Sequence, residues 1–229
     1  MALVRAQTAT NGLTVITNEQ TAGRGQHGNT WLSAPNLNLT FSVIFFPKSL
    51  NLKDSFLLNI ISSLAVTKTL EEYLPKDIAI RVKWPNDIYV NNKKICGILV
   101  ENTIRGEQIQ AVVIGIGLNA NQYVTDLPFA SSMAQESGNT FDLQLVLNRL
   151  CENLERNYLG LEENNLQELY TNYHNSLFGL NTGLHYSDCD GDFEGMVRGI
   201  TSTGELRIEK SNGLLKTYSL KEVRFKNKI

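Results

Sequence analysis

KWPNDIYVNNKKICGILVE, residues 83–101, is the most informative stretch of this chain. Apolar residues fill its two halves, and Asn91-Asn92-Lys93 between the halves is typical of a tight turn. The stretch therefore predicts a β-hairpin whose first strand is interrupted by Trp84-Pro85-Asn86-Asp87. The interruption and its flank combine Lys83, an amide and a carboxylate, and a second lysine, Lys94, is expected just across the hairpin.

Strands and helices are predicted on both sides of this hairpin. Apolar and β-branched runs between turn residues indicate strands over residues 13–17, 38–46, 78–83, 88–90, 95–101 and 110–118. Apolar residues at helical spacing predict helices over residues 53–74, 142–159 and 165–173, and Asp54 can cap the first. The nearly continuous apolar run at 38–46 predicts a strand buried on both faces. These elements favour an α+β main domain, residues 1–178, with a mixed β-sheet flanked by helices.

The pattern of apolar and polar residues changes from about residue 181. Short alternating runs at 194–200, 205–209, 215–220 and 223–225 are separated by Gly204 and by Ser211-Asn212-Gly213. This pattern predicts a small C-terminal β-barrel, residues 179–229.

Composition limits the function classes. Of the 229 residues, 42% are hydrophobic and 19% are charged, which is typical of a soluble globular protein. The formal net charge of −2 favours neither a nucleic acid nor an anionic membrane as partner. No run approaches the roughly 18 apolar residues that a membrane span requires. The three cysteines form no C-x-x-C pair, so we expect a cytoplasmic protein without a disulfide framework or zinc site.

Two further motifs carry possible chemistry. The first is GRGQHG, residues 23–28, preceded by Gln20; its glycines let backbone N–H groups face an anion, and Arg24 can bind a carboxylate or phosphate at two points. Alone it is a weak signal, because glycine-rich loops are common. The second is GIGLN, residues 115–119, where a purine or ribose could approach the backbone closely. By itself such a motif more often marks only a closely packed sheet.

The KWPND motif is the more specific signal. Its plain structural reading is that Trp84 and Pro85 shape a strand end beside solvated polar residues. The functional reading is that the two lysines neutralise phosphate charge while the carboxylate holds magnesium or accepts a proton. Nucleotidyl transfer makes these demands.

Together, in this order and spacing, the three motifs resemble the catalytic domain of biotin protein ligases, also called biotin–[acetyl-CoA-carboxylase] ligases. The resemblance is specific over residues 13–121 and looser beyond them. It implies the sheet-and-helix fold of class II aminoacyl-tRNA synthetases and biotin ligases, followed by a small SH3-like barrel. It also implies ATP and Mg²⁺ as cofactors, biotin as substrate, and a lysine of a biotin carboxyl carrier protein as acceptor.

The resemblance implies roles for individual residues. Arg24, Lys94 and Asp87 are expected to be catalytic, and Asp87 is also expected to hold Mg²⁺. The residues expected to bind biotin are Gln20, Gly23, Arg24, Gly25, Gln26, Lys94 and Gly97. The residues expected to bind the nucleotide are Arg24, Gln26, Trp31, Lys83, Asn86, Lys94 and Asn119. In the implied reaction biotin attacks the α-phosphate of ATP, pyrophosphate leaves, and the carrier lysine then attacks the acyl-adenylate with help from Asp87.

The chain departs from the family pattern in two places. Gln26 stands where many members carry an arginine, which predicts weaker retention of the negatively charged adenylate. The Ser-Thr-Asn segment and helix that members carry before the first strand are not found in residues 1–12, so we expect that part of the ligand wall to be missing or supplied otherwise. No N-terminal helix-turn-helix is recognised, and a repressor role is not expected.

Three other interpretations remain open. A lipoate protein ligase would share the fold and chemistry. A non-catalytic remnant could bind biotin and mainly form homodimers, through a sheet edge that sequence does not locate. A nucleic-acid role for the C-terminal barrel is disfavoured, because its basic residues are balanced by glutamates.

Overall fold

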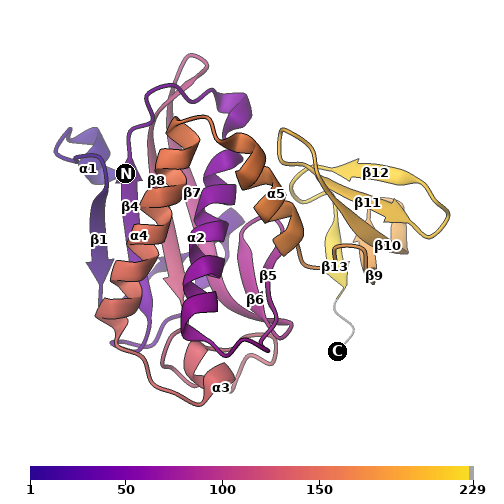
Figure 1. Ribbon diagram of the computed structural model, residues 1–229, viewed down its shortest axis with the longest axis horizontal. Helices are drawn as coiled ribbons and strands as arrows, with labels where there is room; N and C mark the ends of the chain where they lie inside the picture. Colours follow the sequence, from indigo (N-terminus) through magenta and orange to yellow (C-terminus); the bar gives the residue numbers. More distant parts are fainter. Residues whose placement is uncertain (227–229) are drawn as a thin grey trace.

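A six-stranded β-sheet forms the larger part of the molecule, with helices packed on one of its faces (Figure 1). The structure is a computed structural model and describes residues 1–226. In spatial order the strands are β1 (Leu13–Thr17), β4 (Leu39–Phe45), β8 (Gln108–Leu118), β7 (Lys93–Arg105), β6 (Asp87–Val90) and β5 (Ile80–Lys83). Their ladders are antiparallel, and parallel pairing is limited to isolated bridges such as Val82–Leu177 and Lys94–Ala130.

The helical layer covers the sheet with α2 (Leu57–Tyr73), α4 (Leu143–Glu162) and α5 (Leu166–Ser176). Figure 1 shows α2 and α4 side by side across this face, with α5 next to the C-terminal sheet. Short elements complete the larger unit: α1 (Ala2–Arg5), α3 (Met133–Ser137), the 3₁₀ turns Gln26–Gly28 and Leu52–Asp54, and the small hairpin of β2 (Gly23–Arg24) and β3 (Thr30–Trp31). The predicted sheet flanked by helices is therefore observed.

The two largest boundary differences from the sequence prediction have local reasons. The helix predicted over residues 53–74 begins at Leu57, because Leu52–Asp54 forms a separate 3₁₀ turn and Asp54 does not cap it. The strand predicted over residues 95–101 extends from Lys93 to Arg105, because its partner β8 continues the ladder as far as Gln108. The predicted burial of the strand at 38–46 on both faces is confirmed, since six of the seven residues of β4 are buried.

The C-terminal sheet has five antiparallel strands, one more than predicted. Their spatial order is β12 (Leu215–Tyr218), β11 (Leu206–Lys210), β10 (Gly191–Ile200), β9 (Gly183–Asp188) and β13 (Arg224–Lys226). Within residues 1–226 no ladder joins β12 to β13, so the sheet is open where a closed barrel was expected. In the part of the chain that the structure describes, no helix is long and apolar enough to cross a membrane.

Candidate active site

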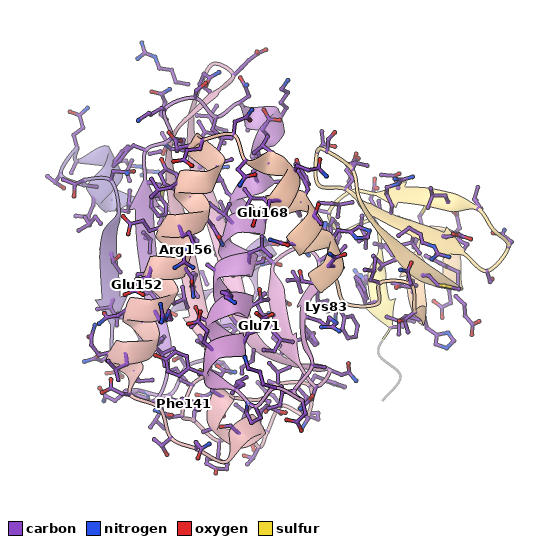
Figure 2. All side chains as sticks on the ribbon, viewed as in Figure 1. Glu71, Lys83, Phe141, Glu152, Arg156 and Glu168 are labelled. Atoms are coloured by element: carbon purple, nitrogen blue, oxygen red, sulfur yellow. The ribbon has the colours of Figure 1, made fainter. Side chains whose placement is uncertain are left out.

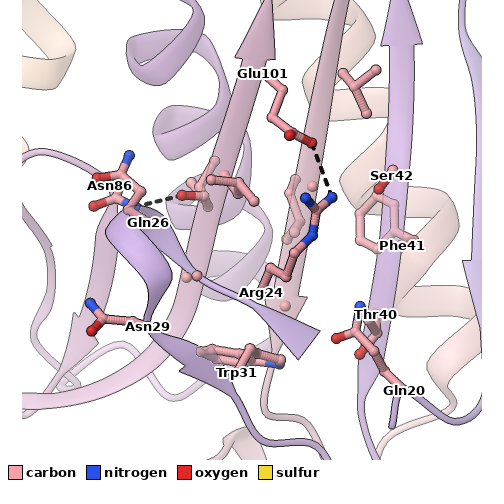
Figure 3. A pocket seen from close by; sticks show the side chains of 18 of the residues that line it. Gln20, Arg24, Gln26, Asn29, Trp31, Thr40, Phe41, Ser42, Asn86 and Glu101 are labelled. Carbon is pink, nitrogen blue, oxygen red and sulfur yellow. Dashed lines mark hydrogen bonds and ion pairs between the residues drawn. The ribbon is translucent and has the colours of Figure 1, made fainter. Parts of the chain in front are cut away.

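A cavity of about 360 Å³ lies on the sheet face opposite α2 and α4, beneath the β2–β3 loop (Figure 3). All three sequence motifs contribute to its wall. The predicted site residues that line it are Gln20, Arg24, Gly25, Gln26, Trp31, Asn86, Asp87, Lys94 and Gly97. The sequence motifs therefore meet at one place, although the residues that form it, from Val15 to Gly117, lie up to 102 positions apart in the chain.

Lys94 and Asp87 form the shortest ion pair of the cavity, with Lys94 Nζ 2.6 Å from Asp87 Oδ1. Both side chains are partly exposed, at 32% and 25% respectively. A shift of register between β6 and β7 inserts one extra residue into β7 between Lys94 and Gly97. Because of this bulge, Lys94 and Gly97 share the cavity face with Asp87, although strict alternation would separate two residues three positions apart.

Arg24 lies over the opposite part of the cavity and faces Glu101 of β7 (Figure 3). The two atoms Arg24 Nη2 and Glu101 Oε2 are 3.6 Å apart, and the arginine side chain is 73% exposed. Such an exposed pair contributes little to stability, so the guanidinium is free to turn toward a carboxylate or phosphate. Glu101 was not predicted. The sequence could have indicated it, because Glu101 follows Gly97 by four residues and the two therefore lie on the same face of one strand.

Trp31 covers the floor of the cavity. The floor has no side chains where Gly97 and Gly117 face each other directly across the β7–β8 ladder. A Cβ added at Gly117 would overlap the indole of Trp31, and one at Gly97 would lie 3.1 Å from it. The indole Nε1 is buried and has no hydrogen-bond partner among the described residues. Gly117 was expected to let a purine or ribose approach the backbone, and Gly97 was expected to bind biotin; in this structure the indole of Trp31 lies against both.

Three predicted residues do not line the cavity. Gly23 borders a neighbouring hollow on the outer side of the same loop. Lys83 lies opposite Asp87 in the β5–β6 ladder, but its ammonium group contacts Tyr89 and the C-terminal sheet instead. Asn119 is buried at the end of β8, where its Nδ2 donates to the carbonyl of Ser131 at 3.0 Å.

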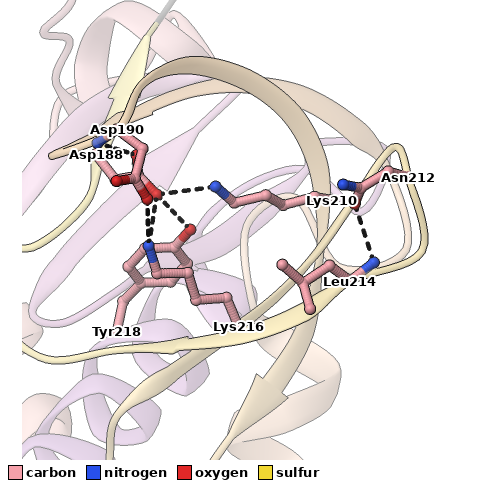
Figure 4. Close-up of polar contacts among 7 residues, drawn as sticks. All are labelled: Asp188, Asp190, Lys210, Asn212, Leu214, Lys216 and Tyr218. Atoms are coloured by element: carbon pink, nitrogen blue, oxygen red, sulfur yellow. Dashed lines mark hydrogen bonds and ion pairs between the residues drawn. The ribbon is translucent and has the colours of Figure 1, made fainter.

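A second polar cluster lies in the C-terminal sheet (Figure 4), and it shares no residue with the cavity lining. Asp188 and Asp190 lie close enough to Cys189 to be considered as metal ligands. However, Asp188 accepts hydrogen bonds from Lys210, Lys216 and the hydroxyl of Tyr218 at 2.8–3.2 Å. Two ammonium groups at the same carboxylate oppose a cation there, so this cluster is a structural ion-pair network. The three cysteines are free, and Cys96 is buried.

The fold and the site together define the class of biotin protein ligase-like proteins. The structure of biotin protein ligase from Aquifex aeolicus in complex with biotin and ATP superposes with a TM-score of 0.78. That match covers 95% of this chain and 90% of the other at 26% sequence identity. The predicted fold class is therefore confirmed.

The sequence comparisons identify the family. The model of the biotin/lipoate A/B protein ligase family matches residues 2–119, just over half of the chain, and the chain belongs to this family. The bifunctional ligase/repressor BirA of Bacillus subtilis is 31% identical over 216 residues, covering 92% of this chain and 66% of that protein. The biotin–[acetyl-CoA-carboxylase] ligase of Paracoccus denitrificans is 34% identical over 105 residues, 46% of this chain and 43% of the relative. This chain thus spans about two thirds of the first relative and less than half of the second.

Proposed function

We propose that this chain activates biotin with ATP as biotinyl-5′-AMP and transfers the biotinyl group to a lysine of a biotin carboxyl carrier protein. The observation that carries the proposal is the convergence of Arg24, Lys94 and Asp87 on one cavity, which supplies two cations and a carboxylate. The similar proteins support it: two of the three reported above are biotin ligases, and the third is a ligase and repressor.

In the first half-reaction, Arg24 would leave Glu101 and bind the biotin carboxylate. Arg24 and Lys94 would then stabilise the negative charge that develops as a carboxylate oxygen attacks the α-phosphate and pyrophosphate departs. The pairing of Lys94 with Asp87 holds the ammonium group in position before the substrates bind. Gln20, the backbone of residues 23–25 and Gly97 would surround biotin, while Gln26, Trp31 and Asn86 would contact the nucleotide.

Magnesium fits this site as an ion that arrives with ATP. Asp87 and Glu101 are the two carboxylates that line the cavity within the described residues, and Glu101 already faces Arg24. Mg²⁺ is commonly held by one or two carboxylates together with substrate phosphates. We assign Asp87 as its protein ligand, and the bound ion would neutralise phosphate charge. Lys83 and Asn119 both lie outside the cavity wall. Asn119 directly follows β8, whose Gly117 lines the cavity, so it is proposed as a neighbour of the adenine; the Lys83 ammonium group points toward Phe225 and is given no such role.

In the second half-reaction, the carrier lysine must lose a proton before it attacks the acyl-adenylate. Asp87 is the carboxylate beside the reacting centre that would accept this proton, directly or through water. The carrier must therefore approach the open side of the cavity. A homodimer is a further part of this proposal, because β1 ends the six-stranded sheet and offers a strand edge for pairing.

The test is pyrophosphate release from ATP with biotin or lipoate, followed by transfer of label to a carrier domain. Biotin-dependent release and transfer support the proposal. Lipoate-dependent release would favour the second candidate, a lipoate ligase, which the family description also covers. Tight biotin binding without turnover would mean that the chain binds biotin and does not catalyse ligation.

A further inference from the structure

The turn between β5 and β6 contacts two different parts of the molecule. Asn86 and Asp87 line the cavity. Trp84 is 6% exposed and donates from Nε1 to the carbonyl oxygen of Gly204 at 2.8 Å. Gly204 lies in the turn between β10 and β11, so the KWPND motif joins the C-terminal sheet directly to the proposed active site.

Gly204 is closely fitted to this contact. Its φ of +88° is a conformation that favours glycine, and a Cβ there would overlap the ring of Phe56. Phe56 in turn packs edge-to-face on Tyr173, with ring centroids 5.8 Å apart. The hydroxyl of Tyr173 donates to the carbonyl oxygen of Pro85 at 3.4 Å. The turn is therefore held through Trp84 by the C-terminal sheet and at Pro85 by α5.

Lys83 adds a second connection between the two units. Figure 2 shows it on the side of the larger unit that faces the C-terminal sheet. Its Nζ donates to the hydroxyl of Tyr89 at 3.0 Å and lies 5.3 Å from the ring centroid of Phe225 in β13. Burial lowers the pKa of this ammonium group, and the nearby Asp87 opposes that shift. The side chain thus spans the junction and does not face the cavity.

The other side of the turn is fixed to β7. The backbone N–H of Ile98 donates to the carbonyl of Asn86 at 3.0 Å, and Asn86 Nδ2 donates to the carbonyl of Ile98. Asp87 also pairs with Gly97 in the ladder. Any displacement of the turn would therefore weaken the protection of the Ile98 amide.

We propose that Trp84 and Lys83 are positioning residues, through which the C-terminal sheet holds Asn86 and Asp87 at the correct distance from Lys94. This inference rests on the proposed ligase function. A misplacement of about 1 Å in an active site can reduce the rate about 100-fold. Loss of the Trp84 donor is therefore expected to reduce kcat strongly while the KM for biotin changes little.

The experiment compares two variants that each remove one hydrogen bond to the same C-terminal turn. Trp84→Phe removes the bond to Gly204, and Tyr170→Phe removes the bond that Tyr170 donates to the carbonyl of Ser202 at 2.8 Å. We expect Trp84→Phe to lower kcat for transfer of the biotinyl group to a carrier domain by about 10- to 100-fold and to speed hydrogen exchange at Ile98. Tyr170→Phe is expected to leave this kcat and the exchange rate at Ile98 at wild-type levels, because Tyr170 does not contact the turn that carries Asp87.

Equal effects of the two variants, or no effect of Trp84→Phe, would overturn the positioning role. If Trp84→Phe does not fold, Lys83→Met keeps the aliphatic stem and is expected to give the same pattern through the junction with Phe225. Exchange at Ile98 is measured without substrate. A wild-type chain that releases no pyrophosphate would therefore refute the ligase function but not the positioning role. Hydrogen exchange at Ile98 would still show whether Trp84 holds the turn that carries Asn86 and Asp87.

Discussion

Lys94 reaches Asp87 because β7 carries a bulge immediately after the lysine, and the resulting separation of Nζ and Oδ1 is 2.6 Å. The bulge turns Lys94 onto the face occupied by Asp87 and Gly97. The ion pair therefore exists before any substrate binds, and the backbone of a paired strand fixes its geometry. Such preorganised charge is the property that a nucleotidyl-transfer site requires.

Replacing Asp87 is expected to separate the two half-reactions. In Asp87→Asn the side chain keeps an oxygen that can accept a hydrogen bond from Lys94 and ligate Mg²⁺, but it cannot take a proton from the carrier lysine. Adenylate formation should stay near the wild-type rate, while transfer falls about 100-fold. Single-turnover measurements of each step would test this, with Glu101→Gln as the control carboxylate in the same cavity. An equal loss in both steps would assign Asp87 to activation instead.

The two glycines of β8 are expected to respond differently to a single methyl group. Gly117→Ala would push its Cβ into the Trp31 indole, whereas Gly115→Ala would meet its nearest neighbours at an ordinary 3.6 Å. Overpacking of this kind costs about 1–3 kcal/mol. We expect Gly117→Ala to alter indole fluorescence and weaken ATP binding about 10-fold, and we expect Gly115→Ala to change neither property. Identical titration curves for the two variants would show that Trp31 is not fixed over the floor.

Gln26 is expected to limit how long the adenylate stays bound. It lines the cavity but carries no charge, so the phosphate there lacks one charge-assisted hydrogen bond. Gln26→Arg should lengthen the half-life of the enzyme-bound adenylate by about 10-fold, the equivalent of about 1.4 kcal/mol. Gln26→Met serves as the uncharged control. Release rates measured by filter binding that do not change in the arginine variant would exclude this explanation.

The C-terminal sheet is expected to lose stability in acid through Asp188. Its side chain is 1% exposed; burial opposes ionisation, but hydrogen bonds from Tyr218 and Lys210 dominate and hold its pKa well below the usual value. Because the folded pKa lies below the unfolded pKa of about 4, the stabilisation is complete above pH 4 and is lost as the pH falls further. Asp188→Asn should therefore flatten the decline of the thermal midpoint between about pH 4 and 2.

The matched control for that measurement is Asp190→Asn, since Asp190 is 70% exposed and pairs with Lys216 alone among the ion pairs of this cluster. It should retain most of the wild-type acid dependence. A profile for Asp188→Asn that follows the wild type would show that other carboxylates control the acid response.

Sequence reasoning found the residues of the site more successfully than their arrangement. The motifs that contain Arg24, Asp87 and Lys94 are local, and each could be recognised without knowing the fold. The bulge after Lys94 could not be predicted, because alternation alone places Lys94 and Gly97 on opposite faces. The contact between Trp31 and Gly117 depends on a loop folding over a distant strand pair, which no local pattern encodes.

For Lys83, membership of a local motif did not predict where the side chain points. It was expected at the nucleotide because it shares a motif with Asn86 and Asp87. The structure directs its ammonium group toward Phe225, more than 140 positions later in the chain. The strand β9 was not predicted because Gly183–Asp188 is short and has only two apolar residues, Leu184 and Tyr186, and its pairing with β10 and β13 forms it.

The central claim is that Arg24, Lys94 and Asp87 activate biotin as an adenylate, and the most direct test is mass spectrometry of the protein after incubation with biotin, ATP and Mg²⁺. The account predicts bound biotinyl-5′-AMP in the wild type and none in Lys94→Met, provided that this variant keeps its wild-type thermal midpoint. Absence of the adenylate from a folded wild-type chain, or its undiminished formation in Lys94→Met, would contradict the account.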